Sequence, residues 1–380
     1  MKNQKICIIG DGLAGLTAAN SLAQLNIDID LFYKKETSKK QKDKRTTAIS
    51  ESNYNFIKED GGIKTKRYFW PIKKINLFYE DKKKFINFLN LEESRSNLMF
   101  VFENSKIKSF LLNKLKKLKN FKYKNHKISN VSIKESHLTI NNKKINYDLI
   151  ILCLGRSASL YKEIIKKRSI KEDNREIAIT AVVQHNGKIK NASQYFFEEG
   201  PLAILPFKNN FFSFVWSIKD NKDIEKDKIK KKILEKFLII FSKKIKFKIN
   251  DIQFFKINLD LKMRYFKNNT LILGDGLHAV HPLAGQGFNL VIRDIKKLKE
   301  IVKKNISLGL TLKNSNVLNQ FYNSRKAENT IFSLGINMTN KFFRRNKFVE
   351  PLKKVLLKKI HKSENVIKVT KYISNKGLLF

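Results

Sequence analysis

The chain begins with the pattern of a buried strand, a glycine turn and a helix. Residues 5–10 are mainly apolar and end in glycine, which is typical of a strand buried on both faces. Residues 13–25 carry apolar and small side chains at helical spacing, and Asn26 tolerates the left-handed conformation that ends many helices. Residues 27–32 are predicted to form a second strand. The pattern predicts a β-α-β unit within a parallel sheet.

Further along the chain the pattern changes and then returns. Residues 148–155 and 270–274 are again apolar runs that end in a glycine turn. Between them, residues 178–183, 196–206 and 211–217 are aromatic, alternating and separated by turn residues, which is typical of an antiparallel sheet. Parallel-type strands on both sides of an antiparallel block predict one domain inserted into another. The lysine-dense residues 219–236 predict a surface helix, and the chain beyond Asp294 is helical in pattern.

Composition adds a strong positive charge. The 380 residues include 78 lysines and arginines against 34 acids, a formal net charge of +44. Such a charge ordinarily indicates nucleic acid or an anionic membrane as the partner. Only 11 of these residues are arginines, which nucleic-acid surfaces favour, and the lysines are spread over the whole chain. We therefore treat the charge as background and expect no nucleic-acid partner.

The two cysteines and the short apolar runs bear on the cellular compartment. Cys7 and Cys153 both lie in apolar runs, where a buried thiol is the expected state, and two cysteines cannot build a disulfide framework. The longest apolar runs, such as residues 149–154, fall far short of the roughly 20 residues of a membrane-spanning helix. The apolar run in residues 1–10 is also too short for a secretory signal. We expect an intracellular protein in a reducing compartment.

A glycine motif follows the first predicted strand. Gly10, Gly12 and Gly15 form G-x-G-x-x-G and open the first helix. Such glycines allow a tight turn and let the backbone approach a pyrophosphate, which the helix N-terminus attracts. The motif predicts dinucleotide binding. An acid that binds ribose is expected about 20 residues on, but Tyr33 stands there, and the nearest acid that follows is Glu36.

A second motif spans residues 271–289, an apolar strand followed by Gly-Asp, His-Pro and a glycine-rich turn. Asp275, at the carboxyl end of the strand, can accept hydrogen bonds from a polyol chain. Pro282 suits a first helical turn, and the helix would direct its positive end at an anion or an electron-rich ring. Gly285 and Gly287 keep that approach free of side chains. A simple strand–turn–helix with a capping Asp would explain Asp275 but not the whole run.

These residues resemble a known family, the class A FAD-dependent aromatic-ring hydroxylases. Within it the chain is most similar to the branch that hydroxylates polyprenylated phenols in ubiquinone biosynthesis. The resemblance rests on four stretches in family order: GDGLAGL (10–16), RTTAIS (45–50), GPLAILP (200–206) and GDGLHAVHPLAGQGFNL (274–290). It implies an α/β fold in which a Rossmann-like FAD-binding domain carries an inserted antiparallel β-sheet substrate domain and a helical C-terminus.

The resemblance also implies which residues form the site. The FAD pyrophosphate would be held by Gly10, Gly12, Leu13, Ala14 and Gly15. Arg45 would contact the ADP side of the cofactor, Asn104 would approach FAD, and Gly274 and Asp275 would bind the ribityl chain. The pyrimidine edge of the flavin would be lined by Pro282, Gly285, Gln286, Gly287 and Asn289. The substrate side would include Gly200, Pro201, Leu205 and Pro206.

Three further positions depart from the family pattern, and two histidines bear on catalysis. The Ala-Asp-Gly expected after the middle strand is Cys153-Leu154-Gly155 here, without its aspartate. Tyr161 replaces an arginine expected a few residues later, and Val291 stands where the family usually has glycine. His278 and His281 flank the flavin turn, and we expect them to pack and orient it. No catalytic base and no metal ligand set is identified.

The implied activity is that of an FAD-dependent monooxygenase that hydroxylates the aromatic ring of a polyprenylated phenol in ubiquinone biosynthesis. NAD(P)H would reduce the flavin, and molecular oxygen would supply the inserted atom. Two alternatives stay open at this point. One is a flavin oxidoreductase of the same fold that inserts no oxygen, and the other is a degenerate scaffold subunit of a quinone-biosynthesis complex. Such a complex is also an expected partner of the enzyme itself.

The same pattern predicts domain boundaries. Residues 1–65, 100–172 and 260–310 are expected to form a discontinuous FAD-binding domain. Residues 66–99 and 173–259 are expected to form the substrate-binding sheet domain. A helical, basic C-terminal region would comprise residues 311–380.

Positive charge exceeds the background in the C-terminal 44 residues. Residues 337–380 hold twelve lysines and arginines against two acids. A helix that begins near Pro351 would place Leu352, Val355, Leu356 and Ile360 opposite Lys353, Lys354 and Lys358. A basic amphipathic helix is typical of peripheral binding to anionic lipid, although packing on the FAD domain explains the pattern equally well. We expect a cytoplasmic protein, peripheral on the inner face of the membrane.

Overall fold

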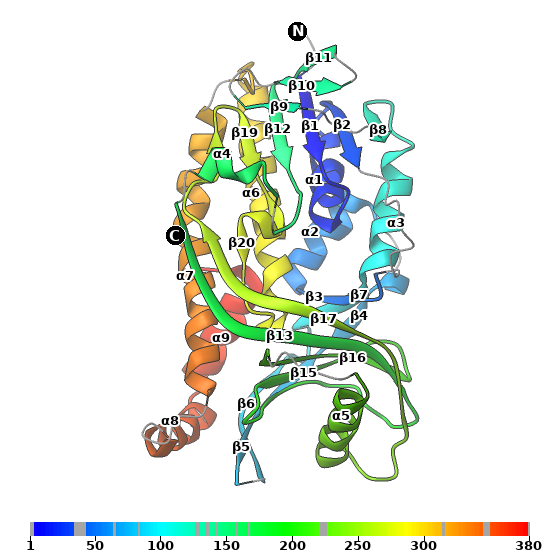
Figure 1. Cartoon of the computed structure of the whole chain (residues 1–380), viewed down its shortest axis with the longest axis vertical. Coiled ribbons are helices and arrows are strands. Elements are labelled where there is room, and N and C mark those ends of the chain that lie inside the picture. Colours follow the sequence, from blue (N-terminus) through cyan, green and yellow to red (C-terminus); the bar gives the residue numbers. More distant parts are fainter. Residues whose placement is uncertain are drawn as a thin grey trace.

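The structure is a computed structural model of the whole chain. It describes residues 4–33, 43–63, 66–82, 84–125, 130–133, 137–140, 143–156, 158–165, 168–220, 226–313, 316–344 and 350–378. Figure 1 shows two sheets at opposite ends of the molecule, with one long helix, α7 (Asn316–Phe343), along the side of both. No helix of the described ranges is long and apolar enough to span a membrane.

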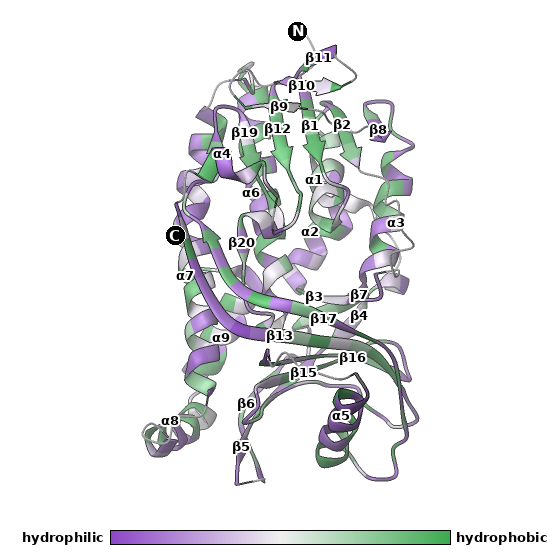
Figure 2. Ribbon diagram, in the orientation of Figure 1, coloured by the Kyte–Doolittle hydropathy of each residue, from purple (hydrophilic) through white to green (hydrophobic). Residues whose placement is uncertain are grey.

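The first sheet has six strands and is parallel except at one edge. In order across the sheet, the strands are β18 (Phe266–Lys267), β19 (Thr270–Ile272), β12 (Leu149–Leu152), β1 (Lys5–Ile9), β2 (Asp28–Tyr33) and β8 (Phe121–Asn125). Only β18 pairs antiparallel. The central strands are apolar along their length, as Figure 2 shows, because helices cover the sheet and leave neither face to water.

The helices of this region follow the glycine turns and the strand ends. They are α1 (Leu13–Ala23), α2 (Glu51–Gly61), α3 (Asn104–Leu115), α4 (Tyr161–Ile165) and α6 (Gln286–Ser307). Helix α1 packs against α2, α3 and α6. The helix ends before the predicted stop at Asn26, because α1 ends at Ala23 with Gln24 as its C-cap, and Asn26 takes its positive φ of 55° in the turn that follows.

The second sheet has eight strands. Their order is β20 (His278–Ala279), β17 (Phe247–Lys262), β13 (Ser169–His185), β16 (Phe211–Lys219), β15 (Pro201–Pro206), β14 (Ala192–Phe196), β5 (Lys74–Asp81) and β6 (Lys84–Glu92). Neighbours are antiparallel except β14 and β5, which run parallel. Together the two sheets and the C-terminal helices confirm the predicted fold class.

Two predicted elements differ from the structure. Residues 196–206 are not one strand, because the chain reverses at Gly200, whose φ is +140° and whose missing Cβ would lie 1.9 Å from the carbonyl oxygen of Ser217. The helix predicted within 219–236 is α5 (Lys226–Ile240), and it is not wholly a surface helix. Ile229, Ile233 and Phe237 bury one of its faces on the second sheet.

Two smaller sheets and two more helices complete the described chain. One sheet has the order β3 (Thr46–Ser50), β7 (Met99–Glu103) and β4 (Trp70–Ile72). The other has the order β11 (Lys143–Asn146), β10 (His137–Ile140) and β9 (Asn130–Ser132). After α7 come α8 (Glu350–Lys362) and α9 (Glu364–Lys376), and α9 contacts α2, β3 and β6.

Candidate functional site

A cavity lies between the parallel sheet and the eight-stranded sheet. Its volume is about 940 Å³, near the upper end of the range of about 300–1,000 Å³ of ligand sites. Its wall combines the first glycine turn, β3, the turn before α6, the inner face of the eight-stranded sheet and the last helix, α9. Segments from both ends of the chain therefore meet at one place.

The first glycine turn places the N-terminus of α1 at the cavity. Gly10 has a φ of +113°, and a Cβ there would lie 2.2 Å from the carbonyl oxygen of Cys153. Gly12 precedes the helix with no side-chain cap and nothing within 4 Å of its Cβ position, and Gly12, Leu13 and Ala14 line the cavity. Gly15 packs under the turn instead, and a Cβ there would lie 1.9 Å from the carbonyl oxygen of Gly10. The amides at this helix end are thus free to bind an anion.

The second wall segment is the strand that follows Arg45. The Arg45 guanidinium pairs with both carboxylate oxygens of Asp43, Nε to Oδ1 at 2.8 Å and Nη2 to Oδ2 at 2.9 Å. Burial raises the pKa of Asp43, but the hydrogen bonds and charge of Arg45 outweigh it and hold the pKa below its usual value. Asn104 is buried, and its Oδ1 accepts a hydrogen bond from the Thr47 hydroxyl at 2.6 Å. Arg45 and Asn104 both line the cavity.

The turn before α6 supplies the third wall segment. It consists of two 3-10 turns, η2 (Gly274–Gly276) and η3 (Leu283–Gly285), joined through β20. Gly285 has a φ of +66°, and α6 begins directly after it without a side-chain cap. Six of the predicted residues of this segment line the cavity: Gly274, Asp275, Pro282, Gly285, Gln286 and Gly287. The cavity therefore receives the uncapped N-termini of two helices, α1 and α6.

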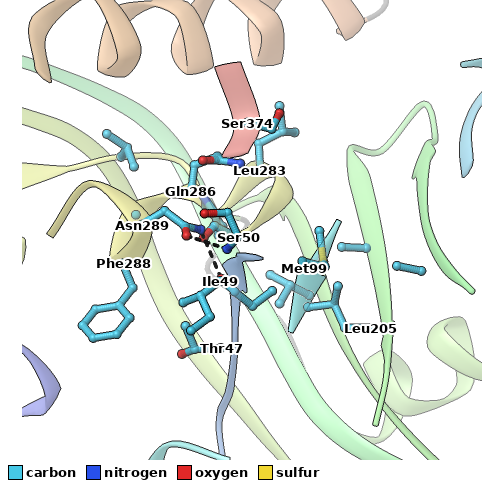
Figure 3. A pocket seen from close by; sticks show the side chains of 18 of the residues that line it. Thr47, Ile49, Ser50, Met99, Leu205, Leu283, Gln286, Phe288, Asn289 and Ser374 are labelled. Carbon is cyan, nitrogen blue, oxygen red and sulfur yellow. Dashed lines mark hydrogen bonds between the residues drawn. The ribbon is translucent and has the colours of Figure 1, made fainter. Parts of the chain in front are cut away.

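Asn289 lines the cavity too, but its side chain is engaged by protein groups. Its Nδ2 donates to the carbonyl oxygens of Ala48 and Gly285, at 3.2 and 3.0 Å. Its Oδ1 accepts from the backbone N–H of Ser50 at 2.9 Å and from Nδ2 of Asn53 at 2.7 Å. Figure 3 shows this amide directed at Ser50. Asn289 thus fastens β3 to the glycine turn.

Tyr161 occupies the place of the missing aspartate and arginine. Its hydroxyl accepts a hydrogen bond from the Leu154 N–H at 3.0 Å, and a Cβ on Gly276 would lie 2.4 Å from that hydroxyl. Burial raises the pKa of Tyr161, and the charge of the nearby Asp275 acts in the same direction. A neutral tyrosine therefore connects the end of β12 to the Gly-Asp-Gly turn.

The end of β2 also lacks the expected acid. Tyr33 stacks on Tyr123 with ring centroids 4.0 Å apart, and the Tyr123 hydroxyl donates to Oδ2 of Asp11 at 3.0 Å. Neither tyrosine lines the cavity. Glu36, the nearest following acid, lies outside the described residues.

Both histidines of the turn are buried beside carboxylates. His278 Nε2 lies 2.7 Å from Oδ2 of Asp294, whose Oδ1 accepts from Arg325 Nε at 2.7 Å. Burial raises the pKa of Asp294, but the charges of Arg325 and His278 outweigh it and lower the pKa. His281 Nε2 lies 3.4 Å from Oε2 of Glu176 on β13. Neither histidine is part of the cavity wall.

On the sheet side the wall is mostly apolar. Leu205 lines the cavity, whereas Gly200, Pro201 and Pro206 belong to the frame of β15 and do not. Figure 3 shows Leu205 and Met99 on one side of the cavity and Gln286 and Asn289 on the other. Other apolar residues of this wall, which no motif singled out, are Ile75, Leu77, Leu91, Leu98, Phe196, Ala203, Val215 and Phe343.

Helix α9 forms part of the cavity wall. Its sequence contains no motif, so this position was not predicted. Lys368, Tyr372 and Asn375 are part of the wall. Asn375 accepts hydrogen bonds from the Ser50 hydroxyl at 3.0 Å, through its backbone oxygen, and from the Ser52 N–H at 2.9 Å, through Oδ1. The Arg293 guanidinium of α6 donates to the last carbonyl groups of α9.

The residues present fit a dinucleotide cofactor with a ring at one end. The free amides and glycine backbone at the start of α1 suit a pyrophosphate. The exposed carboxylate of Asp275 suits a polyol, and the N-terminus of α6 suits an electron-rich ring edge. The sheet side leaves an apolar compartment beyond that ring.

Comparison with known proteins agrees with this arrangement. Residues 153–307 match the family described as FAD binding domain. The chain is 22% identical to the mitochondrial ubiquinone biosynthesis monooxygenase COQ6 of Dictyostelium discoideum over 96% of this chain and 92% of that protein. It is 27% identical to the 3-demethoxyubiquinol 3-hydroxylase of Escherichia coli over 38% of each. The family match and these alignments support an FAD-dependent aromatic-ring monooxygenase.

Solved structures of flavoproteins share the fold over nearly the whole length. Against the p-nitrophenol 4-monooxygenase of Pseudomonas putida, the TM-score is 0.80 at 12% identity, covering 100% of this chain and 99% of that one. Against Klebsiella pneumoniae HpxO, crystallised with FAD and uric acid, it is 0.75 at 14% identity, covering 98% and 97%. The cofactor of this monooxygenase is FAD. Bound FAD supplies the redox chemistry, and the chain binds, orients and shields the reacting ring.

Proposed function

We propose that this monooxygenase hydroxylates the ring of a polyprenylated phenol in ubiquinone biosynthesis, with NAD(P)H as reductant. The observation that supports this proposal most strongly is the apolar wall that the eight-stranded sheet forms opposite the glycine-rich turn before α6. It extends from Val215 and Leu205 to Phe196 and Phe343, so an apolar substrate can bury more than its ring there. The alignment with the Dictyostelium COQ6 protein, over nearly both chains, supports the same assignment.

For the cofactor, we propose that FAD is held by the residues of the three wall segments. Gly12, Leu13 and Ala14 would hold the pyrophosphate, and Asp275 the ribityl chain. Arg45 would release Asp43 to contact the ADP half. The α6 N-terminus at Gln286 and Gly287 would face the pyrimidine edge and stabilise negative charge on it. Gly10, Gly15 and Asn289 would act by shaping the turns.

The same proposal places the protein at an anionic membrane surface. Lys353 of α8 is only 1% exposed, because its ammonium binds Oε1 of Glu350 at 2.7 Å and the Arg344 carbonyl at 3.0 Å. Lys353 is therefore not exposed as predicted, and Leu357 and Ile360 of α8 pack inward beside it, while three other apolar side chains of the helix face outward. Leu352, Val355 and Leu356 are 60%, 53% and 39% exposed.

Lysines flank this face and the next helix. Lys358 and Lys359 are exposed on α8, and Lys368 and Lys376 on α9. Lys368 also lines the cavity, so α9 carries both part of the cavity wall and two of these charges. Exposed apolar side chains beside lysines are the combination that binds anionic lipid. A substrate with a long apolar tail would enter from such a surface.

The quinone profile of cells that lack this protein tests the substrate. We expect an accumulated intermediate that lacks one ring hydroxyl, and its structure names the substrate and the position. An unchanged profile contradicts the assignment to ubiquinone biosynthesis. Purified protein that oxidises NAD(P)H and yields only peroxide with every phenol contradicts oxygen insertion.

Vesicle binding tests the membrane surface. The protein should sediment with vesicles that contain phosphatidylglycerol and much less with phosphatidylcholine alone. Replacing Leu352, Val355 and Leu356 by serine should weaken this binding. The control is L238S/I239S on α5, which removes two other exposed apolar side chains, 46% and 54% exposed, and should leave binding unchanged. Equal effects of the two variants contradict a docking face on α8.

A further inference from the structure

A polar side chain, Gln194, interrupts the mostly apolar sheet wall of the cavity, next to Ser193, which also lines it. Gln194 lies on β14 and is 7% exposed. Its neighbours on the adjoining strands are Leu77 and Ala203, and Val215 follows one strand further. All four line the cavity. An amide is therefore set into a row of apolar side chains.

The alternation of the strand directs this amide to the cavity. The next residue, Tyr195, points to the opposite face, where it stacks on Phe78 at 4.7 Å. Phe196 in turn lines the cavity and stacks on Phe343 at 3.6 Å. Gln194 and Phe196 therefore both lie on the cavity face of β14.

The amide of Gln194 has no hydrogen bond to any residue of the described ranges. The polar atoms of this amide are not among the fully enclosed ones, so they open into the cavity. An amide that opens into a cavity without a protein partner is available to bind a polar group of a ligand. Beside it, the small side chains of Ala192 and Ala203 leave room for a ring.

We propose that Gln194 is the residue that orients the substrate ring, through hydrogen bonds between its side-chain amide and a ring oxygen. The inference rests on the proposed phenol substrate. The amide oxygen accepts a hydrogen bond from a ring hydroxyl, and the amide nitrogen donates to a neighbouring ring oxygen. Because the surrounding wall is apolar, this contact decides which ring carbon faces the flavin. A site built in this way discriminates against a ring that lacks the oxygen.

The test compares Q194M with the wild-type protein on a phenol that carries a short prenyl tail. Methionine keeps the length of the side chain and removes both hydrogen bonds. We expect phenol binding, followed by the flavin absorbance, to weaken about tenfold or more, since a lost buried hydrogen bond is worth about that factor. The ratio of hydroxylated product to NAD(P)H oxidised should fall, and FAD content should not change. Q194N, which keeps an amide, should recover part of the coupling.

The control variant is I204L, on the opposite face of the same sheet, where Ile204 is fully buried. It should bind and hydroxylate the phenol as the wild type does. If Q194M equals the wild type in phenol affinity and coupling, the role of Gln194 is overturned and the proposed function is not. Wild-type protein that binds FAD yet neither binds nor hydroxylates any phenol overturns the proposed function and this inference together.

Discussion

At the scale of single residues, the departures from the family pattern have structural replacements. Tyr161 is an example, since its hydroxyl meets Leu154 and its ring fills the space under Gly276. The sequence revealed that the aspartate was missing, but it could not reveal the contact between Tyr161 and Gly276, because these residues are more than 100 positions apart. The same limit applies to Asn289, whose motif position was predicted and whose four protein contacts were not.

The contact between Tyr161 and Gly276 predicts that one added methyl group at Gly276 strongly destabilises the protein. G276A places a Cβ 2.4 Å from the Tyr161 hydroxyl and should cost about 1–3 kcal/mol in the free energy of unfolding, with a loss of FAD affinity. G335A is the control, because Gly335 lies in α7 with nothing within 4 Å of its Cβ position. That change should stabilise the protein by up to about 1 kcal/mol. Urea unfolding measures both, and a neutral G276A contradicts the contact.

The buried His185 predicts a pH dependence of stability. Burial lowers the pKa of His185 below its usual value of 6.5, so the unfolded chain takes up a proton at a higher pH than the folded protein does. Stability therefore falls as the pH drops through 6.5 toward the lower folded pKa. H185N should reduce the loss of unfolding free energy between pH 7.5 and pH 5.5, measured in urea. If H185N and the wild type lose the same unfolding free energy over this range, His185 is not the source of the pH dependence.

At the scale of elements, the sequence predicted the strands and helices around the glycine motifs well, because buried strands and amphipathic helices have clear periods. It failed where one residue reverses the chain, as at Gly200, and where a helix has one buried face, as in α5. The position of α9 was also not predictable. Helix α9 is held beside the cavity by its own Asn375 and by Arg293 of α6. Neither residue belongs to a motif that the sequence showed.

The hold of Arg293 on α9 is itself testable. Its guanidinium donates to the carbonyl oxygens of Ile373 and Ser374, at 3.3 and 3.2 Å, and its positive charge suits a helix C-terminus. R293M should raise the hydrogen-exchange rate of residues 364–376. K297M, one turn along α6 and exposed, is the matched control and should leave that rate unchanged. Unchanged exchange in R293M shows that packing alone holds α9.

At the scale of the whole molecule, the net charge of +44 predicts how stability depends on salt. Uniform positive charge destabilises the compact state by self-repulsion, and salt screens it over a length of about 10 Å at 0.1 M. The buried pair of Asp294 and Arg325 is screened much less, so the repulsion dominates the response. The midpoint of thermal unfolding should rise from 0.05 to 0.5 M sodium chloride. Sodium acetate at equal ionic strength should give the same rise, and a midpoint that falls in both salts contradicts net repulsion.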